Sequence, residues 1–203
     1  SYAQLSYGNV LNDEGKYLDA IDYFNRAIEL RPYDAEAYNN RGHAYYRMGN
    51  LSQAINDYSK AIEYKAGYAV AYSNRGNAFN EKGLSAQAIE DCTKAIELKP
   101  NLAEAYNNRG NTYREKHDYI HAIQDYDKAI ELKPELAEAW ANRGSAYREI
   151  GDFARALDSC NKAIELKPDF GEAYSSRGIV HSSMGDLHRA IQDYTKAIEL
   201  KPD

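Results

Sequence analysis

The sequence is poor in cysteine and in long apolar runs. Cys92 and Cys160 are its only thiols, so no disulfide framework is expected. No apolar run approaches the roughly 18 residues of a membrane span, and no signal-like segment opens the chain. These absences exclude a disulfide-stapled mini-protein and favour an intracellular, cytoplasmic protein without a membrane partner.

Basic residues are also in the minority. The 203 residues include 25 Lys and Arg against 31 Asp and Glu, for a formal net charge of -6. A general nucleic-acid binder presents a basic stripe, so nucleic acid is not an expected partner. Because the first residue is Ser1 rather than Met, we expect a fragment of a longer protein.

Constellations that carry chemistry are missing as well. His117 and His121 have the spacing of a helical metal pair, but no third ligand accompanies them. No nucleophile, base and orienting group occur together. We therefore expect no enzyme activity, no metal and no cofactor.

What the sequence does have is a period of 34 residues without an insertion. Gly recurs from Gly8 to Gly178, and Ala recurs from Ala20 to Ala190. The six units are 1–34, 35–68, 69–102, 103–136, 137–170 and 171–203. An AIEL-like string followed by Pro closes five units, whereas the second unit has Ala66 in place of Pro.

Each unit carries two helical patterns. In the fourth unit Tyr106, Gly110 and Tyr113 share one face, and Ala122 and Tyr126 share a face of the second helix. We expect Gly110 to face small Ala122 or Ala129 across the pair. Neither short helix can bury its apolar face alone, so successive pairs are expected to stack.

This pattern resembles the tetratricopeptide repeat family over essentially the whole chain. The resemblance rests on Gly8, Ala20, Phe24, Ala27 and Pro32 and their equivalents at the 34-residue period. It implies an all-α fold, an alpha-alpha superhelix in which antiparallel helix pairs form a right-handed solenoid. It also implies a single array over residues 1–203 whose first helices line a concave groove.

An Arg precedes the recurring Gly in five units, and Asp follows it sixteen residues later in four of them. The pairs are Arg41 with Asp57, Arg75 with Asp91, Arg109 with Asp125 and Arg177 with Asp193. Ser159 stands opposite Arg143, and the first unit has Tyr7 and Tyr23 instead. We expect an Arg–Asp ion pair to join the two helices of each unit that has both residues.

Polar residues form two rows on the first helices. The first row contains Asn40, Asn74, Asn108 and Asn142, and the second contains Asn9, His43, Asn77 and Asn111. A carboxamide offers an acceptor and two donors, which is enough to bind the C=O and N–H of an extended peptide. The first row is similar to the asparagine ladder of O-linked N-acetylglucosamine transferases. An alternative is that these Asn are solvated residues copied by repeat duplication.

The sequence therefore predicts a scaffold that binds a protein or an extended peptide in its groove. Because Glu36, Glu104, Glu138 and Glu172 line the expected groove edge, the segment should be neutral to moderately basic. Two alternatives stay open. The chain could recruit substrates for a catalytic domain elsewhere in a larger enzyme, or assemble head to tail through uncapped ends that expose Ile191, Tyr194 and Ile198.

Overall fold

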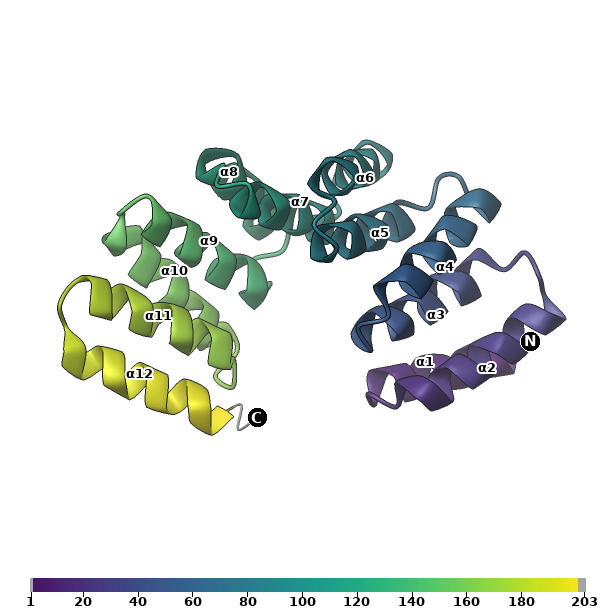
Figure 1. Ribbon diagram of the computed structural model, residues 1–203, viewed down its shortest axis with the longest axis horizontal. Helices are drawn as coiled ribbons and strands as arrows, with labels where there is room; N and C mark the ends of the chain where they lie inside the picture. Colours follow the sequence, from purple (N-terminus) through teal and green to yellow (C-terminus); the bar gives the residue numbers. More distant parts are fainter. Residues whose placement is uncertain (1, 201–203) are drawn as a thin grey trace. The chain divides into compact units, whose positions relative to one another are not determined.

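The chain is entirely helical over the part that the structure, a computed structural model, describes. Residues 2–200 form twelve α-helices and no strand (Figure 1). The helices are α1 (Tyr2–Asp13), α2 (Tyr17–Leu30), α3 (Ala35–Arg47), α4 (Leu51–Tyr64), α5 (Ala69–Glu81), α6 (Ser85–Leu98), α7 (Ala103–Glu115), α8 (Tyr119–Leu132), α9 (Ala137–Glu149), α10 (Phe153–Leu166), α11 (Gly171–Ser183) and α12 (Leu187–Leu200). None of these helices is long and apolar enough to cross a bilayer.

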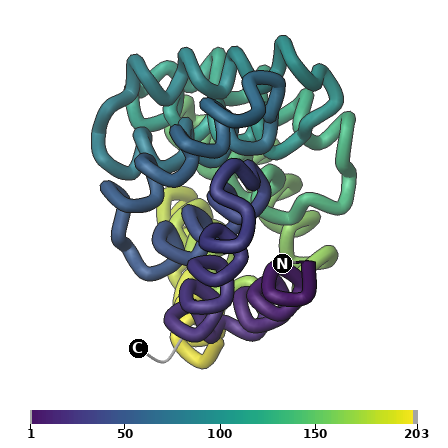
Figure 2. Tube along the Cα trace, turned by 90° about the vertical axis from the view of Figure 1, so that its right-hand side faces the viewer, coloured from purple at the N-terminus to yellow at the C-terminus, as the bar shows by residue number. Residues whose placement is uncertain are grey.

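Each 34-residue unit encloses one helix pair joined by a tight turn. The first unit, for example, contains α1 and α2 and ends in the loop that leads to α3. The reversal of direction between the helices of a pair can be followed along the Cα trace in Figure 2. The predicted all-α fold of consecutive helix pairs is confirmed.

The contacts divide the chain into two compact units, residues 1–108 and residues 109–203, and the division falls within α7. Within the first unit each helix from α1 to α5 packs on its successor, and α3 also packs on α1 and α5. Within the second unit α8 to α12 pack in the same way, and α9 also packs on α11. In both units the first helices of neighbouring repeats therefore lie side by side.

The recurring Gly is required by a close approach of the two helices in a pair. A Cβ on Gly110 would lie 2.8 Å from Cε1 of Tyr126 and 3.2 Å from the backbone oxygen of Ala122. Gly110 therefore lies close to the backbone of Ala122, one of the two residues expected, and also against the Tyr126 ring, which was not expected. It faces an aromatic ring and a carbonyl, and even a methyl group would collide with both.

The second helix ends at the same repeat position with or without Pro. Helix α4 stops at Tyr64 although Ala66 replaces the recurring Pro. The N–H of Lys65 still bonds to the oxygen of Ala61, as the N–H of Arg31 bonds to Ala27 after α2. Pro is therefore not required for the second helix to end at this position.

Candidate functional site

The predicted site residues lie on the first helix of each repeat. Within residues 2–108, Asn9 lies on α1, Asn40 and His43 on α3, Asn74 and Asn77 on α5, and Asn108 on α7. In the second unit, Asn111 lies on α7 and Asn142 on α9. Because the odd-numbered helices of a unit are neighbours, residues at one repeat position approach each other from one helix to the next.

In the first unit the first row is linked by hydrogen bonds between carboxamides. Nδ2 of Asn74 donates to Oδ1 of Asn39 at 3.1 Å. Nδ2 of Asn39 donates to Oδ1 of Asn40 at 3.0 Å, and Nδ2 of Asn40 donates to Oδ1 of Asn9 at 2.8 Å. These three bonds join α5, α3 and α1, and we call the four residues the carboxamide relay.

Asn39 is a member of the relay that the sequence reasoning missed. It stands immediately before Asn40 and is buried. The equivalent residue in the next repeat, Ser73, accepts a hydrogen bond at its Oγ from Nδ2 of Asn108 at 3.1 Å. The sequence did contain an indication of this role, because Asn39 and Ser73 are polar residues at a repeat position that lies on the buried face of the first helix.

The second row also makes specific contacts in the first unit. Asn12 donates to Nδ1 of His43 at 3.0 Å, so this ring nitrogen is an acceptor. Burial lowers the pKa of His43 below its usual range, and Arg47 lowers it further against the smaller opposing effect of Asp13. The imidazole is therefore neutral at pH 7.

Asn77 is held by a partner on the preceding repeat. Its Nδ2 donates to the hydroxyl of Tyr46 at 2.8 Å, and that hydroxyl donates to Glu81 at 3.2 Å. Burial, with the nearby Glu81 charge, raises the pKa of Tyr46 to about 12. The phenol stays protonated and keeps its donor role.

The relay borders a polar hollow of about 360 Å³ in the first unit. Its lining consists of Asn9, Asn12, Asp13, Asn39, Asn40, His43 and Asn74. The structure therefore brings four of the eight predicted residues together. Asn77 and Asn108 lie on the same unit but do not line this hollow.

The two predicted residues of the second unit contact side chains within that unit. Oδ1 of Asn111 accepts from the hydroxyl of Tyr126 at 2.8 Å. Oδ1 of Asn142 lies 3.5 Å from Nη1 of Arg114, which is a long hydrogen bond. Each carboxamide is thus oriented by a neighbour on its own or the preceding repeat.

The expected Arg–Asp pairs are confirmed. Arg41 donates from Nε and Nη2 to the two oxygens of Asp57, each at 2.7 Å. The same bidentate pairing, at 2.6 to 2.9 Å, joins Arg75 to Asp91, Arg109 to Asp125 and Arg177 to Asp193. The carboxylates are buried, so these arginines belong to the framework rather than to an open groove.

The two exceptions find other partners. Arg143 donates to Ser159 at 3.1 Å and to Asp127 at 2.7 Å. In the first repeat the rings of Tyr7 and Tyr23 stack with their centroids 5.4 Å apart. Stacking therefore replaces the ion pair in that repeat.

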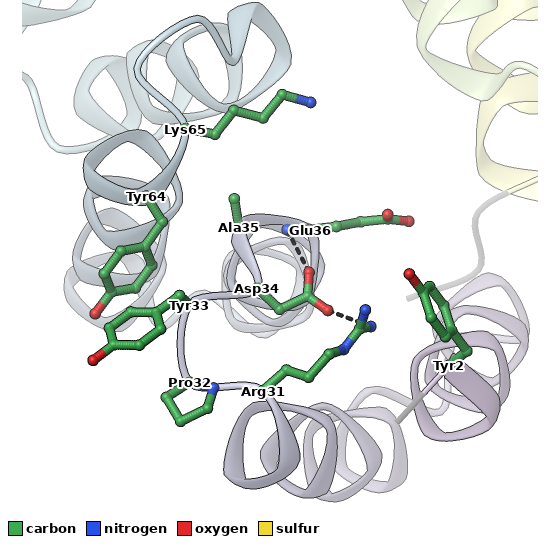
Figure 3. A pocket seen from close by; sticks show the side chains of 9 residues that line it. All are labelled: Tyr2, Arg31, Pro32, Tyr33, Asp34, Ala35, Glu36, Tyr64 and Lys65. Atoms are coloured by element: carbon green, nitrogen blue, oxygen red, sulfur yellow. Dashed lines mark hydrogen bonds and ion pairs between the residues drawn. The ribbon is translucent and has the colours of Figure 1, made fainter.

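A second hollow of about 640 Å³ lies at the junction of the first two repeats (Figure 3). It is lined by Tyr2, Arg31, Pro32, Tyr33, Asp34, Ala35, Glu36, Tyr64 and Lys65. Tyr2 stands on one side and Tyr33 and Tyr64 stand together on the other, with Arg31 and Asp34 between them (Figure 3). The sequence analysis did not single out this group, which we call the tyrosine hollow.

Comparison with solved structures places these sites on a known architecture. The crystal structure of MamA aligns with a TM-score of 0.64 and 28% identity, over 78% of this chain and 93% of that one. A chain of the APC/C hetero-tetramer Cut9–Hcn1 aligns with a TM-score of 0.90 and 22% identity, over 98% of this chain and 40% of that one. YrrB, a TPR protein with an unusual peptide-binding site, aligns with a TM-score of 0.60 and 24% identity, over 89% of this chain and 93% of that one.

Comparison with sequences gives the family. No curated protein matches the sequence significantly. The family described as tetratricopeptide repeat matches residues 35–67, 69–102, 103–136, 137–170 and 171–203. A profile described as TPR repeat matches residues 8–49. The chain belongs to the tetratricopeptide repeat family.

Proposed function

We propose that this scaffold for protein–protein interaction binds an extended peptide segment along the carboxamide relay and the two predicted rows. The observation that carries the proposal is the polar hollow of about 360 Å³ that the relay borders. Carboxamides from the first helices of three successive repeats converge there. Such a series of carboxamides suits the regularly spaced backbone amides of an extended peptide.

The relay leaves donors for a ligand. Each Asn carboxamide has two N–H groups, and Asn40 and Asn74 each direct one of them to another carboxamide. The second N–H of each suits a backbone carbonyl of the bound segment. His43 adds a further donor at Nε2, because its Nδ1 accepts from Asn12.

The charges near the relay favour a neutral to moderately basic segment. Asp13 is part of the hollow, and its lining holds no Lys or Arg. Glu36 is exposed on the helix that carries Asn40. An acidic segment would meet repulsion from both carboxylates, whereas one or two basic side chains would be attracted.

The experiment is a pull-down with mass spectrometry, followed by titration of peptides from the captured proteins. The natural chain is compared with a variant in which Asn40, Asn74, Asn108 and Asn142 are all changed to Ala. Each lost hydrogen bond removes about 0.5–1.5 kcal/mol, so the variant should bind at least about tenfold more weakly. The matched control is Asn101→Ala, since Asn101 is exposed and lies between helices.

Circular dichroism must first show that the natural chain and the fourfold variant have equal helicity. Unchanged peptide affinity in a folded fourfold variant would refute the role of the first row. Loss of affinity in Asn101→Ala as well would show that the effect is not specific to the row.

A second candidate function, head-to-tail self-association, is favoured by the surface of α12. Ile191 and Ile198 are 64% and 68% exposed, and Leu187 on the same helix is 64% exposed. Tyr194 on the same helix is half-buried, so Ile191, Ile198 and Tyr194 are all at least partly exposed, as expected. In sedimentation experiments the apparent mass should then rise with protein concentration. It should be lower in the Ile191→Glu and Ile198→Glu variants and unchanged in Asn74→Ala.

A further inference from the structure

The tyrosine hollow departs from the repeat pattern at the residues that line it. Where Tyr2 stands, four other repeats have Glu, and where Tyr33 stands, later repeats have Gly67, Asn101, Glu135 and Asp169. Tyr64 occupies a position that is Leu in the other five repeats. Asp34 replaces an aromatic or aliphatic residue, as in Tyr68, Leu102, Leu136 and Phe170. Residues of the first two repeats therefore depart from the repeat pattern where they line one hollow.

Core packing accounts for Tyr64, which packs on the cluster of Ala35, Ala61 and Ala71, but not for Tyr2 and Tyr33. Tyr2 is 75% exposed and Tyr33 is 76% exposed, so neither ring is needed to fill a core. Tyr64 is half-buried and packs edge-on against Tyr33, with ring centroids 5.3 Å apart. Exposed aromatic groups that gather around a concavity are typical of a binding surface.

The charges of the hollow are balanced and already engaged. Arg31 forms an ion pair with Asp34 at 2.5 Å, and its guanidinium lies 4.1 Å from the centroid of the Tyr2 ring. Asp34 also accepts from the N–H groups of Glu36 and Ala37 at 3.1 and 3.3 Å. The lining holds two cations, Arg31 and Lys65, and two anions, Asp34 and Glu36. A cationic ligand would be repelled by Arg31 and Lys65, and an anionic ligand would be repelled by Asp34 and Glu36.

The exposed rings and the balanced charges of the lining together favour an uncharged ligand with flat apolar surfaces. Tyr2 lies on one side of the Arg31–Asp34 pair, and the adjacent Tyr33 and Tyr64 rings lie on the other side with their hydroxyls directed away from Tyr2 (Figure 3). Proline rings pack well on tyrosine faces, and a polyproline II helix has no internal hydrogen bonds, so its carbonyls are open to donors. The Tyr hydroxyls and the Lys65 ammonium at the rim are such donors.

We infer that the tyrosine hollow is a second docking site, which takes an uncharged proline-rich segment in the polyproline II conformation. It shares no lining residue with the hollow of the carboxamide relay. The two sites are therefore independent, and a single partner could engage both only with two different segments.

The test is a titration of the natural chain with a blocked oligoproline peptide, followed by backbone amide shifts in NMR. The peptide should shift the amides of residues 31, 33–36 and 64–65 with a saturable dependence on concentration; Pro32 has no amide proton. Replacing Tyr33 by Asn, the residue of the third repeat, should weaken binding about tenfold, since truncating an aromatic anchor has that order of effect. Tyr2→Glu, the residue of four other repeats, should do the same.

Two control variants test whether the oligoproline binds in this hollow. Leu18→Ser removes an exposed apolar side chain outside the hollow and should leave binding unchanged. Asn74→Ala disturbs the carboxamide relay and should also leave it unchanged, so failure of the proposed relay function does not mimic failure here. Tyr2 and Tyr33 are both exposed, so their variants should melt like the natural chain.

Three results would overturn the inference. One is an absence of shifts at residues 31 and 33–36 in excess oligoproline. Another is an equal response to a blocked Gly-Ser peptide of the same length, which would remove the role of proline. The third is stronger binding of blocked oligolysine or oligoglutamate at the same amides, which would refute selection for an uncharged ligand.

Discussion

Asn74 donates a hydrogen bond to Asn39 across the boundary between the second and third repeats, with Nδ2 and Oδ1 3.1 Å apart. Asn39 then donates to Asn40 on its own helix. The carboxamides of the first row therefore have two tasks, since they join neighbouring repeats and also present the remaining N–H groups to the hollow. The stability of the chain and the proposed peptide binding therefore depend on the same side chains.

Changing Asn39 to Ala should destabilise the chain, because Asn39 both accepts from Asn74 and donates to Asn40. Its side chain is 6% exposed, so water restores these bonds poorly. Loss of two hydrogen bonds should lower the free energy of unfolding by about 1–3 kcal/mol, as measured by urea denaturation. An effect no larger than that of Asn101→Ala would mean that the relay contributes nothing to stability.

Changing Asp125 to Asn should destabilise the chain through the Arg109 pair. The two bonds are 2.8 Å long, and Asp125 is 6% exposed. Because Asn removes the charge and one acceptor, we expect a loss of at least about 1 kcal/mol. The control on the same helix is Glu131→Gln, since the Lys128–Glu131 pair is largely exposed and should contribute close to zero. An unchanged melting temperature in Asp125→Asn would refute a stabilising pair.

The fold and the ion pairs were predictable from the sequence because both repeat. Arg and Asp occur together in four repeats and are absent together from the first, and this covariation within one chain indicates contact. The Gly was predictable as a place of close approach, but its aromatic neighbour was not. Sequence spacing does not show that the Tyr126 ring lies over Gly110, or that the backbone of Gly110 approaches the carbonyl oxygen of Ala122.

The tyrosine hollow was not predictable, because its residues come from the start of α1, the loop before α3 and the end of α4. Each departure from the repeat pattern, taken alone, reads as ordinary variation at a surface position. Only the three-dimensional arrangement shows that Tyr2, Tyr33 and Tyr64 surround one cavity. The missed role of Asn39 has the same origin, since hydrogen-bond partners between repeats depend on side-chain direction.

Changing Gly110 to Ala should destabilise the chain although Ala is the better helix former. The propensity gain is about 1 kcal/mol, but the new methyl would lie 2.8 Å from the Tyr126 ring and 3.2 Å from a carbonyl oxygen. Overpacking costs about 1–3 kcal/mol, so a net loss is expected in urea denaturation. Gly67→Ala is the control, since an added Cβ there meets nothing within 4 Å. Equal stability of the two variants would contradict the close approach.

The two thiols should be inert in the folded chain. Cys92 and Cys160 are both fully buried, and burial raises the pKa of Cys160 to about 12. Because the thiolate is the reactive form, Ellman's reagent should label neither residue on the timescale on which it labels the chain in urea. Rapid labelling of one thiol in native buffer would show local opening of the helix pair that contains it.

Stability should fall as the pH is lowered through the titration of His43. Burial, aided by Arg47, lowers the pKa of His43 in the folded state, whereas an unfolded imidazole titrates near about 6.5. Below that pH the unfolded chain binds a proton that the folded chain does not, so the free energy of unfolding declines by up to about 1.4 kcal/mol per pH unit. The contribution is fully present above the unfolded pKa and is lost on acidification.

The variant His43→Asn isolates this effect, because Asn77 occupies the same position in the next repeat. Urea denaturation of both proteins between pH 8 and pH 5 gives the difference, in which the four other histidines cancel. The stability advantage of the natural chain over the variant should shrink as the pH falls. A difference that stays constant over this range would mean that the pKa of His43 is the same in the folded and unfolded states, and that burial does not lower it.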